Sequence, residues 1–165
     1  MAKPTKNAAL ICTIMSVVAA IGIIIGLVAK SPLAILIVLV PSVAYEAYRT
    51  EGESTRWASW VMVGVLVLEF ILVIFHIGFD LAGFLGTSSE QVAGYTVPLG
   101  DIRIVGPAVM AVLALILIIR TRGVYTRWLA VNIIVCVLAL TFVLDPNVFQ
   151  GLLRQGVQEG FKQLN

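Results

Sequence analysis

The sequence predicts an all-α integral membrane protein, in which a bundle of five transmembrane helices is followed by a C-terminal amphipathic helix. The first supporting observation is composition: 60% of the 165 residues are apolar and 12% are charged, whereas a soluble domain has about 45–50% apolar and about 25% charged residues. The mean hydropathy is +1.04. Because so few charged residues cannot cover a water-soluble surface, we expect residues 1–165 to form a single membrane domain in a lipid bilayer.

The second observation is a series of five apolar segments, each close to or above the roughly 17–25 residues that a spanning helix requires. The predicted spans are residues 8–29, 31–48, 57–79, 104–120 and 124–144. The first is longer than the roughly 7–15-residue apolar core of a signal peptide, and no small-residue cleavage site follows it, so we expect it to remain as a span. The connection at 80–103 is rich in Gly, Ser and Pro, which are typical of loops.

The third observation is a four-residue periodicity in the C-terminal tail, residues 146–164. Asp145 is suited to cap a helix here and Pro146 to begin it. Apolar residues then recur every four positions and polar residues take much of the opposite side: Phe149, Leu153, Val157 and Phe161 against Arg154, Gln158, Glu159 and Lys162. This pattern predicts an amphipathic helix that lies on the membrane surface or docks on a partner protein.

The distribution of Lys and Arg predicts the orientation of the five spans. Seven of the 11 basic residues fall on the side of the N-terminus: Lys3, Lys6, Arg49, Arg56, Arg120, Arg122 and Arg127. The opposite side receives the other four: Lys30, Arg103, Arg154 and Lys162. Because short cytoplasmic loops carry the excess of basic residues, we expect a cytoplasmic N-terminus and a C-terminus on the opposite side of the membrane.

Three titratable side chains in and after the third predicted span form the first candidate site. Glu69 lies 12 residues after Trp57, which is about 18 Å along a helix axis and near the predicted membrane midplane. His76 comes seven residues later and Asp80 four beyond that. A continuous helix would place all three on nearly one face. Such a ladder resembles the outer half of an access path for protons or cations.

Two other spans carry polar groups at a similar predicted depth. Ser42 follows Pro41 in the second span, where the proline ring leaves one backbone carbonyl without its helical donor. Asn132 lies near the middle of the fifth span. Together with Glu69 these residues suit a proton or ion path. They equally suit an interhelical hydrogen-bonding site that only stabilises the bundle, by about 0.6–2 kcal/mol.

Gly22 and Gly26 lie four residues apart in the first span, in the sequence GIIIG. This small-xxx-small spacing lets the backbone of another helix approach closely. We therefore expect both glycines to be helix-packing positions. The sequence leaves open whether the packed helix belongs to the same bundle or to another chain.

Several chemistries have no support in the residues. One histidine cannot ligate a haem from both sides, and Cys12 and Cys136 lie in different spans and form no CxxC pair. Glu69 and His76 would be about 10 Å apart along a helix axis, which is too far to share one metal ion. We expect no cofactor, no metal, no nucleic-acid partner and no enzymatic activity.

Two functional hypotheses follow from these patterns. In the first, the protein acts by helix packing, as a subunit or accessory factor of a membrane complex or as a homo-oligomer, through Gly22, Gly26 and the tail. In the second, it is a small proton- or cation-coupled transporter or channel that uses Glu69 at the membrane midplane.

Overall fold

The computed structural model describes residues 7–50, 53–78, 90–92, 95–97 and 102–146. Its five helices are α1 (Ala8–Ala29), α2 (Pro32–Arg49), α3 (Glu53–Ile74), α5 (Ile102–Arg120) and α6 (Val124–Leu144). All five are long and apolar enough to cross a membrane, which confirms the prediction of a multi-pass helical bundle. Apart from Pro146, the predicted amphipathic helix at 146–164 lies outside the described residues.

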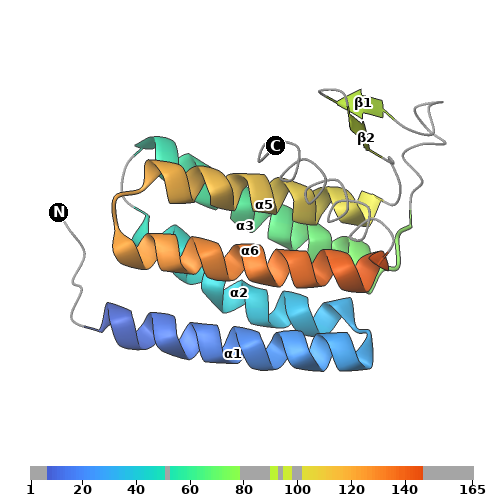
Figure 1. The fold of residues 1–165 in the computed structure, drawn as a ribbon, viewed down its shortest axis with the longest axis horizontal. Helices are drawn as coiled ribbons and strands as arrows, with labels where there is room; N and C mark the ends of the chain where they lie inside the picture. The colour runs from blue at the N-terminus through green and yellow to red at the C-terminus, as the bar shows by residue number, and fades with distance from the viewer. Residues whose placement is uncertain (1–6, 51–52, 79–89, 93–94, 98–101, 147–165) are drawn as a thin grey trace, which may run out of the picture.

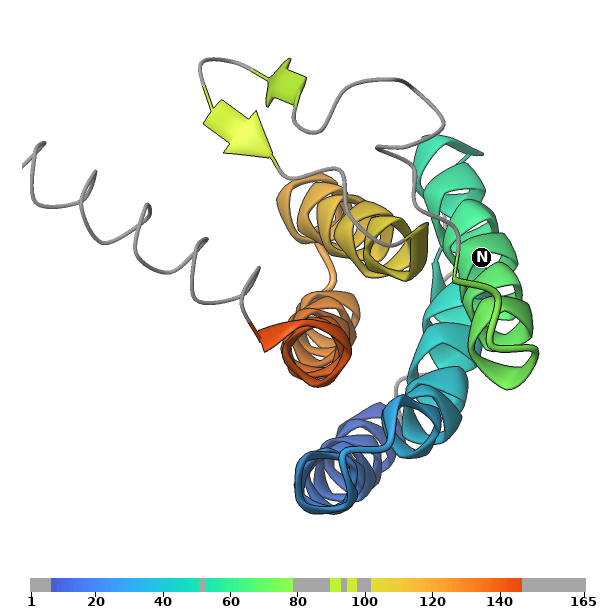
Figure 2. The ribbon, with the colours of Figure 1, turned by 90° about the vertical axis from the view of Figure 1, so that its right-hand side faces the viewer.

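Four of the helices form a ring, and the fifth lies outside it. Within the ring, α2 packs against α3 and α6, and α5 packs against the same two helices. Helix α1 lies on the outer side, against α2 and α6 (Figure 2). Successive helices run in opposite directions (Figure 1). The start of α1, the end of α2 and the start of α6 therefore share one end of the molecule, which we call the N-terminal end of the bundle.

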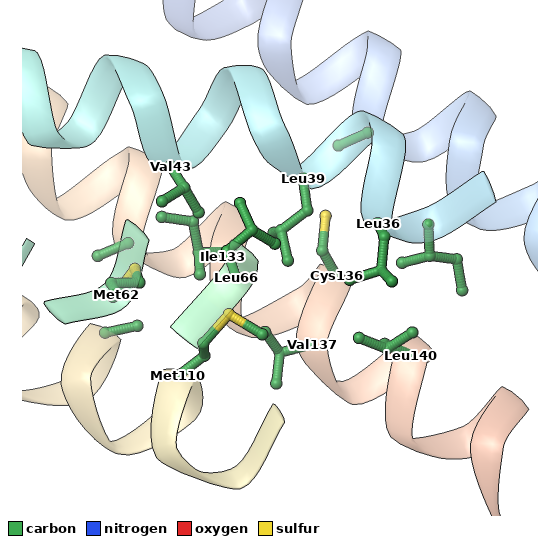
Figure 3. Packing of buried hydrophobic residues seen from close by; sticks show 14 of the residues in the cluster. Leu36, Leu39, Val43, Met62, Leu66, Met110, Ile133, Cys136, Val137 and Leu140 are labelled. Atoms are coloured by element: carbon green, nitrogen blue, oxygen red, sulfur yellow. The ribbon is translucent and has the colours of Figure 1, made fainter. Parts of the chain in front are cut away.

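The hydrophobic core fills the inside of the ring (Figure 3). Its side chains come from all four ring helices: Leu36, Leu39 and Val43 of α2, Met62 and Leu66 of α3, Met110 of α5, and Ile133, Cys136, Val137 and Leu140 of α6. Each of these is at most 5% exposed. The large apolar side chains on the outer faces of the helices remain exposed, as expected where the surrounding medium is hydrocarbon rather than water.

Two helices end in the same local structure, a Schellman motif. At the end of α1, Lys30 has a φ of 50° and the amide of Ser31 donates to the carbonyl of Gly26 at 2.9 Å. At the end of α3, His76 has a φ of 51° and the amide of Ile77 donates to the carbonyl of Leu72 at 3.0 Å. In both cases a left-handed residue turns the chain away from the helix axis and satisfies carbonyls of the last turn.

The end of α3 corrects the sequence prediction. The predicted span 57–79 assumed that the helix continues through the apolar residues after Ile74, but α3 runs from Glu53 to Ile74. Apolar composition continues beyond the helix, so hydropathy alone did not reveal the Schellman motif. The connection from α3 to α5 contains two short strands, β1 (Glu90–Val92) and β2 (Tyr95–Val97), which pair antiparallel as a hairpin.

Candidate functional site

Glu69 of α3 is fully buried, with 0% of its surface exposed. It shares a helical stripe with Met62 and Leu66, which also face the core. Opposite it on α5 lies Gly106, and a Cβ built on this glycine would overlap Oε2 of Glu69 and lie 3.1 Å from its Cδ. The missing side chain of Gly106 therefore provides the space that the Glu69 carboxyl occupies.

The position of Glu69 along its helix differs from the sequence prediction. It lies five residues before the end of α3, or about 7.5 Å along the axis. The predicted mid-depth position depended on a helix that began at Trp57 and continued to Phe79. Measured from the observed helix ends, Glu69 is in the third of α3 farthest from the N-terminal end of the bundle.

Ser42 and Asn132 meet across the interface between α2 and α6. The side-chain amide of Asn132 donates to Oγ of Ser42 at 3.2 Å. Ser42 is fully buried and Asn132 is half-buried. Of the three polar residues predicted at similar depth, the structure joins these two in one hydrogen bond. Glu69 lies in a different helix contact, against Gly106 of α5.

The alignment of His76 with Glu69 on one helical face is wrong. His76 follows the end of α3 and adopts a left-handed backbone conformation, so the 100° rotation per residue no longer applies. Its side chain is exposed, and Nδ1 lies 3.1 Å from the carbonyl oxygen of Ile74. Its observed role is therefore local, at the helix end. Asp80, the outermost predicted member of the ladder, lies outside the described residues.

A second buried carboxylate, which the sequence analysis did not select, lies at the N-terminal end of the bundle. Glu46 of α2 is 0% exposed. The hydroxyl of Thr50 lies 3.1 Å from Oε1 of Glu46 and 2.8 Å from its backbone carbonyl oxygen. Ser59 of α3 donates to Oγ1 of Thr50 at 2.9 Å. These three side chains, which we call the Glu46 cluster, join α2 to α3 through buried oxygen atoms.

Arg49 lies one helical turn after Glu46 but faces aromatic rings. Its guanidinium carbon is 5.8 Å from the ring centre of Tyr45 and 5.5 Å from that of Tyr125. Its NH1 group also donates to the Tyr45 hydroxyl at 3.4 Å. Cation–π contacts of this length contribute about 0.5–1 kcal/mol at exposed sites and more when desolvated. They hold Arg49 between α2 and α6.

A signal for Glu46 is present in the sequence. Leu39, Val43, Glu46 and Thr50 are spaced four, three and four residues apart, which is the spacing of one helical face. All four are buried. An acidic residue on the apolar face of a helix, at a position where the spacing predicts a buried apolar side chain, indicates a buried acid. This signal was missed because Glu46 lies among Tyr45, Tyr48 and Arg49, whose composition is typical of a membrane boundary.

The two packing glycines contact a helix of the same chain. A Cβ on Gly22 would overlap the side chain of Val38, and a Cβ on Gly26 would overlap that of Ile35. Both neighbours belong to α2. Gly22 and Gly26 therefore allow α1 and α2 to approach closely within the bundle.

The described residues were compared with the requirements of a metal site and of a disulfide. Among them, no group of three or more His, Cys, Asp or Glu side chains is arranged to hold a metal ion. Cys12 and Cys136 are buried and are not joined in a disulfide.

Comparisons of the chain with protein families, with curated proteins and with solved structures found no match. The functional argument therefore depends on the buried polar groups.

Proposed function

We propose that this protein is a small proton- or cation-coupled transporter or channel in which Glu69 binds the transported ion. The observation that supports this most is the complete burial of the Glu69 carboxyl in a membrane bundle, in space left by Gly106. Acids within membrane-spanning helices are rare and commonly belong to ion or proton pathways. They also face the protein interior rather than lipid, as Glu69 does.

Buried polar groups at three levels suggest the route. The Glu46 cluster is at the N-terminal end, and the Ser42–Asn132 hydrogen bond is about 6 Å farther along α2. Glu69 is beyond it, toward the other end. The core side chains Leu66 and Met110 lie inside the same ring. Ion movement between the levels would therefore require water entry or a shift of the helices, as in gated transport.

The orientation proposed for this function is a cytoplasmic N-terminus and a C-terminus on the opposite side. Among the described residues, five arginines are near the N-terminal end of the bundle: Arg49, Arg56, Arg120, Arg122 and Arg127. Lys30 and Arg103 are the described basic residues near the other end. The excess of basic residues supports a cytoplasmic N-terminal end.

Reconstituted liposomes test the transport proposal. A proton or sodium gradient across the liposome membrane should produce a flux in the unmodified protein, measured with an internal ion-sensitive dye. Glu69→Gln keeps the side-chain size but removes the exchangeable charge, so flux should fall to the level of empty liposomes. The matched control is Gly64→Ala on the same helix, since a Cβ there meets nothing within 4 Å. Absence of flux in the unmodified protein, or unchanged flux in Glu69→Gln, contradicts the proposal.

A second candidate is the assembly role, as a homo-oligomer or as a subunit of a membrane complex. It is favoured by α1, because only 22% of the residues in its most apolar stretch are buried. Ile14 and Ile21 on this helix are each 52% exposed, so an apolar face is available to lipid or to another subunit. Because Gly22 and Gly26 already contact α2, substitutions there would disturb the fold as well as any assembly.

The exposed face of α1 gives the sharper assembly test. Purification in a mild detergent, followed by native mass measurement, should give more than one chain per particle. Ile14→Trp with Ile21→Trp should reduce that mass, because the added bulk prevents close packing at an interface but is tolerated by lipid. Val135→Trp on α6, where the native side chain is 49% exposed, is the matched control. A particle containing a single chain contradicts the assembly role.

A further inference from the structure

The Glu46 cluster has too few hydroxyl protons to serve all of its short oxygen–oxygen contacts. Thr50 carries one hydroxyl proton, yet its Oγ1 lies 2.8 Å from the Glu46 carbonyl oxygen and 3.1 Å from Oε1 of Glu46. Ser59 also has one, yet its Oγ lies 2.9 Å from Thr50 Oγ1 and 3.2 Å from the carbonyl oxygen of Thr55. Each hydroxyl can donate only once at a time.

A protonated Glu46 supplies the additional donor. Its O–H then donates from Oε1 to Thr50 Oγ1, while Thr50 donates to the backbone carbonyl of Glu46. When Glu46 is ionised, the Thr50 hydroxyl can rotate and donate to Oε1 instead, because the same carbonyl also accepts the amide of Thr50 at 2.9 Å. Both protonation states therefore fit the same oxygen positions, and the helices need not move for a proton to bind or leave.

Burial makes the two protonation states unequal in energy. Oε2 of Glu46 is buried and has no hydrogen-bond partner among the described residues. Leaving a buried carboxylate oxygen unpaired costs more than leaving a neutral carbonyl oxygen unpaired. A neutral Glu46 is therefore compatible with this arrangement, whereas an ionised Glu46 calls for a nearby positive charge.

Arg49 is positioned to supply that charge. Within the described part of the chain, Nε of Arg49 is buried without a hydrogen-bond partner. Its guanidinium is held over Tyr45 and Tyr125, one turn from Glu46. Cys12 of α1 has its Sγ 3.9 Å from the carbonyl oxygen of Tyr125, and α3 contributes the uncharged Ser59. Among the described residues, Arg49 on the same helix is thus the cation placed to act on the Glu46 carboxyl.

We propose that Glu46, Thr50 and Ser59 form a proton-binding site at the N-terminal end of the bundle, and that Arg49 competes with the proton for the Glu46 carboxylate. When the proton leaves to the adjacent aqueous phase, the negative charge remains on Glu46 and attracts the guanidinium away from the two tyrosine rings. This proposal does not depend on transport through Glu69, because proton binding at Glu46 can be measured in a protein that carries no flux.

Infrared spectroscopy of the purified full-length protein in lipid nanodiscs tests the site directly. Protonated carboxyl groups give a C=O stretching band that disappears on ionisation. One titrating band should be lost in Glu46→Gln and retained in Glu69→Gln, the matched buried acid. A titrating spectrum that is the same in Glu46→Gln and in the unmodified protein overturns the proposal.

Further variants test the hydroxyl contact and the competition. Thr50→Val removes the hydrogen-bond partner at nearly constant volume and should shift the frequency of the Glu46 band, whereas Thr50→Ser should leave it in place. Arg49→Gln removes the competing cation, so the band should persist to higher pH; Arg49→Lys should restore the original midpoint. An unshifted midpoint in Arg49→Gln contradicts the competition. These variants keep Glu46, so they remain informative if Glu46→Gln does not fold.

Discussion

Among the described residues, Glu46 and Glu69 are the fully buried carboxylates of the bundle, and their surroundings differ. Glu46 lies beside the hydroxyl of Thr50, which can donate to its carboxyl or accept from it, and Ser59 in turn donates to Thr50. Glu69 lies on an apolar stripe of α3, and the feature that admits its carboxyl is the missing side chain of Gly106. A buried acid can therefore lie beside hydroxyl groups or in the space left by a glycine. The first arrangement adjusts to the protonation state through hydroxyl rotation, and the second depends on close packing.

Gly106→Ala should give the largest effect, because it fills the space that Glu69 occupies. We expect the free energy of unfolding to fall by about 2–3 kcal/mol, as for other overpacked cores, measured by denaturant titration in detergent. Gly64→Ala, whose Cβ meets nothing within 4 Å, should be neutral or slightly stabilising because alanine favours helices. Adding Glu69→Ala should remove most of the Gly106→Ala cost. An equal cost with and without the carboxyl would contradict the space argument.

Gly22→Ala examines a glycine contact that contains only hydrocarbon. A Cβ there overlaps Val38, but Val38 is only half-buried and α1 lies outside the ring. We therefore expect a smaller loss of unfolding free energy than at Gly106, about 1–2 kcal/mol. Val38→Ala in the same chain should relieve it. A cost larger than that of Gly106→Ala would show that the carboxyl adds nothing special to the Gly106 contact.

Thr50→Val tests the hydrogen-bonded acid. Removing the Thr50 hydroxyl takes away a contact to Glu46 and the acceptor for Ser59. We expect a loss of about 1 kcal/mol in unfolding free energy, which Thr50→Ser should largely avoid. Equal losses in the two variants would mean that the methyl packing, rather than the hydroxyl, stabilises this end of the bundle.

The Ser42–Asn132 hydrogen bond lies between the two acids and should give the smallest effect. A double-mutant cycle of Ser42→Ala and Asn132→Ala should yield a coupling energy of about 0.6 kcal/mol, the average for interhelical hydrogen bonds in membranes. In the transport assay, a pure stabilising role predicts unchanged flux in both variants. Flux that falls in either variant would instead assign this pair to the proposed route.

The sequence by itself determined the helical class of the protein and, within the described residues, the five helices that are apolar and long enough to span a membrane. Composition and segment length are sums over neighbouring residues, so they need no knowledge of the fold. The boundary between the predicted spans 8–29 and 31–48 was equally local, because proline suits the first position of a helix but does not continue a preceding one. The packing role of Gly22 and Gly26 was also predictable, although their partner was not.

Tertiary structure alone decided which buried groups meet. Ser42 and Asn132 are 90 residues apart, and helical periodicity gives the face of a side chain but not the helix opposite that face. The placement of Glu69 against Gly106 and of Thr50 beside Ser59 required the packing of α5 and α2 on α3. The end of α3 at His76 likewise depended on a backbone turn that continuing hydropathy concealed. The local sequence therefore determined where most helices form, and the packing of the helices determined which buried polar side chains meet.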